Sequence, residues 1–211
     1  MRRIGLLGGS FNPAHRGHRN LSLHALHAFR LDEIWWLVSP GNPLKEDRGN
    51  APFAVRFASA RKQALRLPIR VTAIERTLGT RYTVDTLAAL RRRYPRDRFI
   101  WLMGADNLAQ FHRWRDWRTI ARRVPIAVAQ RSGYDGRAHA ARAMGWLRRF
   151  VRPAGQARHW TKWRLPALVL LNMPPDPTSA TALRAADPHW HRTEAFTRRN
   201  LRDGVTRRSL A

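Results

Sequence analysis

Short, wholly apolar runs alternate with helix-length segments along most of this chain, and this alternation constrains the fold more than any other feature. We predict strands at 4–7, 34–38, 71–74, 99–103, 126–129 and 168–171. Strands that are apolar on both sides belong in a parallel sheet whose two faces are covered by helices. The sequence therefore predicts an α/β fold, a doubly wound parallel sheet with helices on both faces.

The segments between these runs space their apolar residues at helical intervals. Helices are predicted near 17–30, 52–67, 83–93, 107–123, 136–149, 179–186 and 193–203. Residues 151–166 are the least regular stretch and are interpreted as a surface excursion. No repeat or linker divides the chain, so we expect a single domain over 1–211, with the C-terminal helices from about 179 completing its ligand site.

The chain is strongly basic, since 40 Lys and Arg residues against 14 Asp and Glu give a formal net charge of +26. All but three of the 40 are Arg, and they are spread along the chain. We favour solvated faces and a field that attracts anionic small molecules over a role in binding nucleic acid. The absence of cysteine excludes disulfides, zinc–thiolate sites and thiol nucleophiles.

No apolar run reaches the length of about 20 residues that a membrane span requires. The N-terminus also lacks a secretory pattern, because the apolar run after Arg3 is too short for a signal core. We therefore expect a cytoplasmic protein with no membrane partner.

The loop after the first predicted strand carries the strongest functional signal, GGSFNPAHRGH at residues 8–18. Its two glycines let the backbone approach a ligand closely. The following helix directs its first N–H groups and the positive end of its dipole at the same place. His15 and His18 are three residues apart and can face one bound group, where imidazoles can donate hydrogen bonds to phosphate oxygens. The pattern predicts a nucleotide-phosphate site.

A second set of phosphate-binding residues stands near the C-terminus. Ser179 precedes a predicted helix and can cap it beside a phosphate. Thr181 adds a hydroxyl, and Arg184 a guanidinium fork suited to phosphate oxygens. Taken alone, this triplet is also typical of an ordinary capped surface helix. Lys45 lies in a loop at the same sheet edge, where a solvated lysine is the alternative interpretation.

In this order along the chain, the motifs resemble those of the HxGH nucleotidyltransferases, most closely the bacterial nicotinate-nucleotide adenylyltransferases. The resemblance rests on residues 8–18, 35–45, 79–87, 104–114 and 179–184. The second segment lacks the commoner Pro-Pro-His-Lys ending, and Ala180 replaces the second Ser of Ser-Ser-Thr-x-Ile-Arg. Residues 136–166 and the C-terminal tail have no counterpart. The resemblance implies a Rossmann-like fold of the nucleotidyltransferase type.

The resemblance also implies roles for individual residues. The catalytic set is His15, His18, Lys45 and Arg184. ATP is expected to contact Gly8, Gly9, Ser10, Phe11, His15, His18, Ser179, Thr181 and Arg184, and the acceptor to contact Asn12, Tyr82, Thr83, Asp106 and Trp114. In these roles Trp114 offers a flat face to a pyridine ring, Thr83 offers donors to a carboxylate at a helix start, and Asp106 accepts from ribose hydroxyls.

The implied reaction transfers the adenylyl group of ATP to nicotinate mononucleotide, giving nicotinate adenine dinucleotide and pyrophosphate. The acceptor phosphate is largely dianionic at neutral pH, because its second pKa is about 6, so it needs no general base. No carboxylate cluster stands out as a metal site, so we expect Mg²⁺ to be held mainly by the ATP phosphates. A monomer or a homo-dimer is expected.

Several other functions are open to a chain of this kind. One alternative is a related adenylyltransferase whose acceptor is nicotinamide mononucleotide or phosphopantetheine, and another is a cytidylyltransferase. Residues 82–83 and 106–114 argue against the phosphopantetheine enzyme and against the cytidylyltransferase. A dehydrogenase would need Gly-x-Gly-x-x-Gly after the first strand, and a class I aminoacyl-tRNA synthetase a Lys-Met-Ser-Lys-Ser loop. A non-catalytic, Arg-rich nucleic-acid-binding protein is opposed by the intact His15, His18 and Arg184.

Overall fold

The structure is a computed structural model that describes residues 1–41, 50–131, 140–174, 176, 178–192 and 201–210. Within this part of the chain, the strands form one parallel sheet in the order β3-β2-β1-β4-β5-β7-β6. The strands are β1 (Arg3–Gly9), β2 (Glu33–Val38), β3 (Ile69–Thr72), β4 (Arg98–Gly104), β5 (Ile126–Arg131), β6 (Val151–Arg152) and β7 (Leu168–Met173). The predicted doubly wound α/β fold is confirmed.

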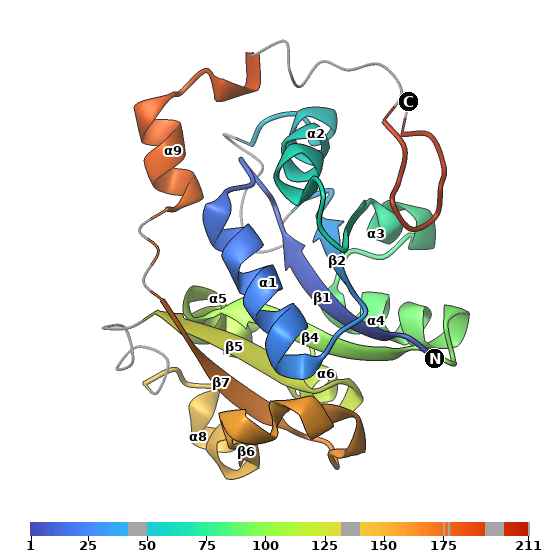
Figure 1. The fold of residues 1–211 in the computed structure, drawn as a ribbon, viewed down its shortest axis with the longest axis vertical. Helices are drawn as coiled ribbons and strands as arrows, with labels where there is room; N and C mark the ends of the chain where they lie inside the picture. The colour runs from blue at the N-terminus through green and yellow to red at the C-terminus, as the bar shows by residue number, and fades with distance from the viewer. Residues whose placement is uncertain (42–49, 132–139, 175, 177, 193–200, 211) are drawn as a thin grey trace.

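Helices cover both faces of the sheet and enclose a separate core on each (Figure 1). One face carries α1 (Arg16–Phe29), α2 (Phe53–Ala64) and η3 (Ala154–Lys162). The other carries α3 (Ile74–Leu78), α4 (Thr83–Arg93), α5 (Ala105–Gln110), η1 (Phe111–Arg113), α6 (Trp117–Arg123) and α8 (Met144–Leu147). Neighbouring residues of β2 point to opposite faces of the sheet. Trp35 is buried in the core beneath α4, and Trp36 is buried in the core beneath α1.

The strand order places the ends of β1 and β4 at the point where the chain changes direction across the sheet. From β1 the chain moves outward to β2 and β3, then returns to the other side of β1 as β4. Parallel sheets of this kind bind ligands beyond the carboxyl ends of the strands at such a point. The loop from Ser10 to His15 and the start of α5, directly after Gly104, lie at this edge.

Two predicted elements end differently in the structure. The third strand was predicted to run to Ile74, but it ends at Thr72 and Ile74 begins α3. The backbone N–H of Ala73 donates to the carboxylate of Asp203 at 2.6 Å, so it leaves the strand ladder. The predicted helix over 52–67 ends at Ala64.

The basic segment 136–149 was predicted to be one helix, but in its described part only a short α-helix forms. Residues 140–143 are not helical, and α8 is followed by the short 3₁₀ turn η2 (Arg148–Phe150). The prediction for residues 136–139 falls outside the described residues.

The stretch 151–166, interpreted from the sequence as a surface excursion, contributes to the core. β6 adds to the sheet beside β7, and η3 packs on α1. Trp160 is buried, and its indole N–H donates to the carbonyl of Phe29 at 3.1 Å. An aromatic ring thus fixes this segment over the end of α1.

The chain ends in a segment that docks on β3. Of the helix predicted over 193–203, residues 193–200 lie outside the described residues, and 201–203 are not helical. Arg202 instead pairs with Ser209 in an antiparallel bridge. The buried carboxylate of Asp203 accepts from the Thr72 hydroxyl at 2.9 and 3.0 Å and from backbone N–H groups. The segment is therefore held by polar contacts as well as by packing.

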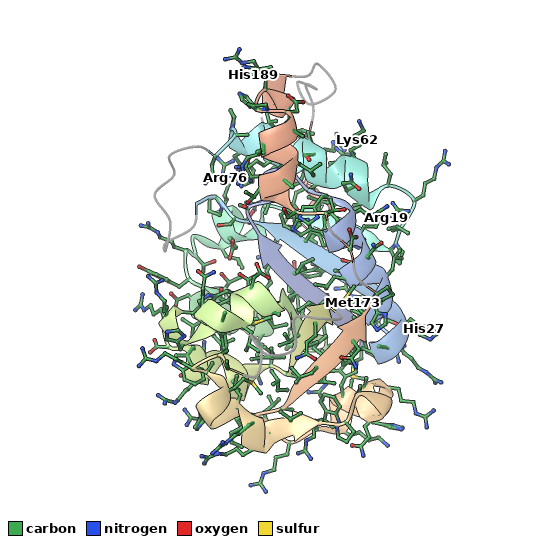
Figure 2. All side chains as sticks on the ribbon, turned by 90° about the vertical axis from the view of Figure 1, so that its left-hand side faces the viewer. Arg19, His27, Lys62, Arg76, Met173 and His189 are labelled. Atoms are coloured by element: carbon green, nitrogen blue, oxygen red, sulfur yellow. The ribbon has the colours of Figure 1, made fainter. Side chains whose placement is uncertain are left out.

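Basic side chains come from several elements of the described chain. Figure 2 labels Arg19 of α1, Lys62 of α2 and Arg76 of α3 among them. No helix in the described part of the chain is long and apolar enough to cross a bilayer.

Candidate active site

Two histidines form the cap of the helix that follows β1. His15 is the N-cap of α1, and its Nδ1 accepts the backbone N–H of Gly17 at 3.1 Å. His18 Nδ1 in turn accepts the backbone N–H of His15 at 3.2 Å. This is the reciprocal arrangement of a capping box, built from imidazoles in place of a hydroxyl and a carboxamide. It satisfies two backbone donors at the helix start and fixes both rings.

The capping contacts decide which ring nitrogen carries the proton. An imidazole nitrogen that accepts a hydrogen bond has no hydrogen, so a neutral ring in this geometry carries its proton on Nε2. Both His15 and His18 are then Nε2–H donors. Their ring centroids are 3.9 Å apart, so the two donors belong to one site.

Gly17 is required by the position of the His15 ring. A β-carbon at residue 17 would lie 2.9 Å from Cε1 and 3.0 Å from Nδ1 of that ring. Real side chains do not approach so closely, and a substitution would push the ring off the helix start. The glycine between the histidines is thus explained by packing of the imidazole.

Phe11 supports the loop from inside. It has a left-handed backbone (φ 49°), which is uncommon for a residue with a β-carbon, and its ring is buried. The ring stacks on Trp36 with ring centroids 5.0 Å apart, and its centroid lies 4.8 Å from that of the His18 ring. Predicted from the family resemblance as an ATP contact, Phe11 lies in the core, beneath one of the two histidines.

The last predicted motif meets the first in space. Arg184 lies on α9 (Ala180–Ala186), which Figure 1 shows beside the amino-terminal end of α1. Its Nη1 donates to the backbone carbonyl of Asn12 at 2.5 Å, and its Nη2 lies 3.4 Å from the hydroxyl of Thr181. Ser179 caps α9 as predicted, because its hydroxyl accepts the N–H of Ala182 at 3.1 Å.

Asp176 anchors the segment that carries α9, a role that the sequence did not suggest. Its carboxylate accepts from the Asn20 amide at 2.7 Å and the Thr178 N–H at 2.9 Å, and it pairs with Arg16 at 3.5 Å. Hydrogen bonds from Thr178, together with the charge of Arg16, hold the pKa of Asp176 at about 2. The carboxylate therefore fastens α9 to α1 at every pH near neutrality.

Arg56 on α2 is a second residue that sequence reasoning missed. Its side chain is buried and its guanidinium donates to the carbonyls of Ser10 at 2.7 Å, Ser39 at 2.9 Å and Ala51 at 2.9 Å. One cation thus holds the loops after β1 and β2 together. The sequence could have pointed to a buried role for Arg56, because it is the only charged residue in the stretch 53–60, whose other residues are apolar or small.

Most residues predicted to bind the acceptor lie at the start of α4 and around α5. Asn12 is instead buried in the loop after β1, where its side chain donates to Asn50 and accepts from the Ala51 N–H. Thr83 is the first residue of α4, whose N-cap Tyr82 makes no side-chain cap. Asp106 is exposed in the first turn of α5 and folds back over Gly104, where a β-carbon would lie 2.5 Å from its Oδ1. Trp114 is half-buried and meets Trp101 edge-on, with ring centroids 6.1 Å apart.

A buried carboxyl group, Glu75, lies behind the start of α4. Its Oε1 is 3.1 Å from the hydroxyl of Thr86. Burial raises the pKa of Glu75 from 4.5 to about 7, and the hydrogen bond from Thr86 offsets only part of that effect. The group is therefore partly protonated at neutral pH.

This raised pKa predicts a pH-dependent stability. The folded state keeps the proton of Glu75 between pH 4.5 and about 7, where the unfolded state loses it. The protonated group contributes roughly 3 kcal/mol to the free energy of unfolding. This contribution is complete below the pKa of the unfolded state and is lost as the pH rises through the pKa of the folded state. In urea unfolding at pH 4.5 and 8.5, Glu75→Gln should therefore gain stability relative to the wild type at the higher pH. The exposed Asp85→Asn is the control, and a Glu75→Gln curve parallel to the wild type would contradict the assignment.

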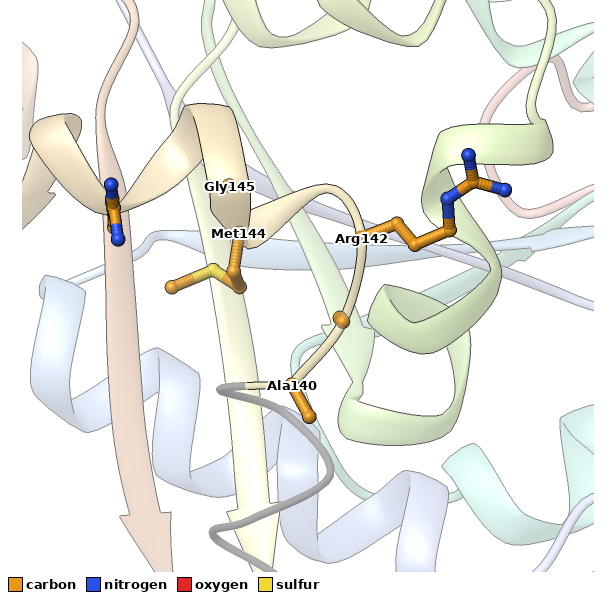
Figure 3. Close-up of a pocket in the computed structure, with 6 residues that line it drawn as sticks. Ala140, Arg142, Met144 and Gly145 are labelled. Atoms are coloured by element: carbon orange, nitrogen blue, oxygen red, sulfur yellow. The ribbon is translucent and has the colours of Figure 1, made fainter.

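Two shallow pockets are lined by none of the predicted site residues. One, of about 350 Å³, is lined by residues between Ala140 and Arg148, and in Figure 3 the Arg142 side chain points away from Met144. The other, of about 360 Å³, lies between α1 and the end of β7, where Figure 2 shows His27 near Met173. Lys45 lies outside the described residues, so the geometry of the loop it belongs to is not part of the site described above.

Similarity to known proteins identifies the family. The model of the cytidylyltransferase-like family matches residues 6–186. A protein of Erythrobacter litoralis named a probable nicotinate-nucleotide adenylyltransferase is 60% identical over 208 residues, covering 99% of this chain and 94% of that one. A Bradyrhizobium protein of the same name is 50% identical, covering 89% and 98%. This chain belongs to the nicotinate-nucleotide adenylyltransferase family. The resemblance seen in the sequence is confirmed.

Solved structures related to the nicotinate-nucleotide adenylyltransferases share the fold. A Plasmodium falciparum nicotinic acid mononucleotide adenylyltransferase complexed with NaAD aligns with a TM-score of 0.64 at 16% identity, covering 88% of this chain and 83% of that one. The same protein complexed with APC gives a TM-score of 0.60. The match to the family model ends at the last residue of α9, so it includes every predicted site residue.

Proposed function

We propose that this chain transfers the adenylyl group of ATP to nicotinate mononucleotide, releasing pyrophosphate and forming nicotinate adenine dinucleotide. The chain is a nucleotidyltransferase by family. One observation carries the proposal for the site: His15 and His18 cap the same helix start through Nδ1, at the switch point of the sheet, with Arg184 bonded to the same loop. Anionic phosphate groups are the ligands that this arrangement suits.

The proposed site binds the ATP phosphates between α1 and α9. The two Nε2–H groups and the dipole of α1 act on the α-phosphate, and their hydrogen bonds strengthen as negative charge develops there. Ser179, Thr181 and Arg184 hold the outer phosphates, and Lys45 is proposed to join them. Gly8, Gly9 and Ser10 line the approach from the end of β1. Phe11 acts from below by supporting His18.

The proposed reaction is an in-line displacement. An oxygen of the acceptor 5′-phosphate attacks the α-phosphorus of ATP, a new P–O bond forms, and the bond to the β-phosphate oxygen breaks as pyrophosphate leaves. A largely dianionic phosphate attacks without a general base. The protein's contribution is to hold two polyanions in contact and to stabilise the added charge.

Mg²⁺ belongs to this proposal as the companion of ATP. Among the described residues, no group of three or more His, Cys, Asp or Glu side chains could hold a metal ion. An ion with that few carboxylates near it is held mainly by phosphate oxygens and water, and it would supply further charge neutralisation to the phosphates. Asp106, two residues after the end of β4, is assigned to the acceptor.

The acceptor is proposed to lie between α4 and Trp114. The uncapped start of α4, with the hydroxyl of Thr83, suits the nicotinate carboxylate, because backbone N–H groups and the helix dipole favour an anion. Trp114 packs nearly perpendicular to Trp101 and is half-buried, which suits stacking of an exposed part of its ring on a pyridine ring. Asp106 is assigned to ribose hydroxyls, and Asn12 and Tyr82 to further contacts with the acceptor.

Pyrophosphate release tests the reaction directly. We expect release from ATP and Mg²⁺ with nicotinate mononucleotide, and much slower release with nicotinamide mononucleotide, because only the former carries the carboxylate that α4 attracts. Equal rates with both would remove the assignment of Thr83 while keeping the reaction class. No release with either would overturn the proposed function.

Trp114→Leu should separate the two substrates. Loss of one aromatic stacking partner costs about 1 kcal/mol, so KM for nicotinate mononucleotide should rise about five-fold. KM for ATP should stay within two-fold of the wild type, since Trp114 is not assigned to ATP. The half-buried Trp117, which lies on α6, provides the control Trp117→Leu. A parallel rise of both KM values in Trp114→Leu would place this ring outside the acceptor pocket.

A further inference from the structure

The turn that leads into α4 is tied to the buried carboxyl group of Glu75 by one hydroxyl. Thr86 Oγ1 lies 3.1 Å from Glu75 Oε1, 3.2 Å from the carbonyl of Tyr82 and 2.9 Å from the hydroxyl of Thr80. The backbone N–H of Thr80 also donates to the carbonyl of Glu75 at 3.0 Å. Glu75 and Thr86 therefore contact both ends of the turn that presents Thr83.

The number of hydrogens in this cluster decides which bonds can form together. Thr86 has a single hydroxyl hydrogen and can donate it to one acceptor at a time. When Glu75 is protonated, the acid can donate to Thr86 Oγ1, and Thr86 is then able to donate to the Tyr82 carbonyl. When Glu75 is ionised, Thr86 must donate to the carboxylate, and the Tyr82 carbonyl loses that bond. Among the described residues, the Thr86 hydroxyl is the hydrogen-bond donor to the buried Glu75 carboxylate. A buried charge with so few donors favours opening of the turn above it.

We propose that Glu75 is a positioning residue for the acceptor, which in its protonated form holds, through Thr86, the turn that presents the start of α4. The inference rests on the proposed function, because it assigns the start of α4 to nicotinate mononucleotide. The raised pKa of Glu75 places the change between the two forms near neutral pH. Acceptor use should therefore weaken as the pH rises through about 7.

Other charged groups around α3 make their contacts elsewhere. Asp85 on α4 pairs with Arg115 at 3.8 Å, and Arg115 also lies over the ring of Tyr82. Arg76 on α3 is exposed, and its guanidinium lies over an aromatic ring of α2. On the strands, Glu33 of β2 accepts from the Trp35 indole, and Asp203 accepts from Thr72 beside β3. Among the described residues, burial and the Thr86 hydroxyl are thus the influences that set the charge of Glu75.

Glu75→Gln tests the inference, because a carboxamide keeps an N–H donor toward Thr86 at every pH. The measurement is kcat/KM for nicotinate mononucleotide at saturating ATP, for variant and wild type, from pH 6 to pH 8.5. The ratio of variant to wild type cancels the titration of the substrate phosphates. We expect a ratio near one at pH 6 that rises to about five-fold at pH 8.5, the effect of one lost hydrogen bond. The same ratio for ATP, at saturating acceptor, should stay near one throughout.

Two further variants separate positioning from folding. Thr86→Val removes the link and should lower kcat/KM for nicotinate mononucleotide about five-fold already at pH 6. Asp85→Asn removes an exposed carboxylate from the same helix, and its ratio to the wild type should not change with pH. A wild type that uses nicotinate mononucleotide, with a Glu75→Gln ratio that is flat from pH 6 to 8.5, overturns this inference alone. A wild type with no turnover overturns the proposed function and this inference with it.

Discussion

Replacing His18 by alanine is expected to lower kcat by about 10²- to 10³-fold at saturating ATP and acceptor, the usual effect of removing one donor to a developing oxyanion. His18 accepts the His15 N–H through Nδ1, so a neutral ring carries its proton on Nε2, the atom proposed to donate to the α-phosphate. The contact should strengthen as charge develops, and the loss should appear in kcat more than in KM for ATP. Steady-state pyrophosphate release is the measurement.

The same substitution also removes half of the capping box, and two variants separate that effect from catalysis. His18→Gln retains an acceptor for the His15 N–H, as glutamine does at this position of a capping box, but lacks the imidazole. It should recover most of the stability lost in His18→Ala, about 1 kcal/mol, without recovering kcat. His27→Ala, on the exposed side of the same helix, should leave both quantities unchanged. Near-normal turnover in His18→Ala would falsify the role assigned to this ring.

Replacing Arg56 by methionine should destabilise the protein by about 3 kcal/mol or more, because it leaves three carbonyls, the buried one of Ala51 among them, without their charged donor. Those carbonyls belong to Ser10, Ser39 and Ala51, so the loops after β1 and β2 should loosen at the same time. Urea unfolding gives the loss of stability. The rise of KM for ATP, measured at a temperature where the variant is folded, gives the effect on the site.

Arg61 provides a matched control on the same helix. It is exposed, so Arg61→Met should change the free energy of unfolding by less than about 0.5 kcal/mol. Arg56→Lys should recover only part of the loss, since an ammonium cannot reproduce the planar fork that reaches two loops. An Arg56→Met protein as stable as Arg61→Met would show that the loops hold their positions without this cation.

Local patterns in the sequence predicted most of the sheet and the ligand edge. Parallel strands are buried on both sides, so runs such as 34–38 and 99–103 are recognisable by their apolar side chains alone. The cap of α9 by Ser179 was equally local, because a helix start is satisfied by side chains within three residues, whereas the capping role of His15 was not predicted. The strand order was not predicted from the sequence and is a finding of the structure.

Contacts between residues far apart in the chain could not be predicted in this way. Nothing near Arg56 in sequence shows that its guanidinium meets Ser10, 46 positions away, and nothing near Asp203 shows that its carboxylate ends β3. The raised pKa of Glu75 depends on burial by other elements. The sequence by itself determined the fold class and marked the loop of residues 8–18 as the candidate site, because both depend on periodicity and short-range patterns. Only the tertiary structure decided which charged groups are buried and which loops they join, because burial is a property of the packed chain.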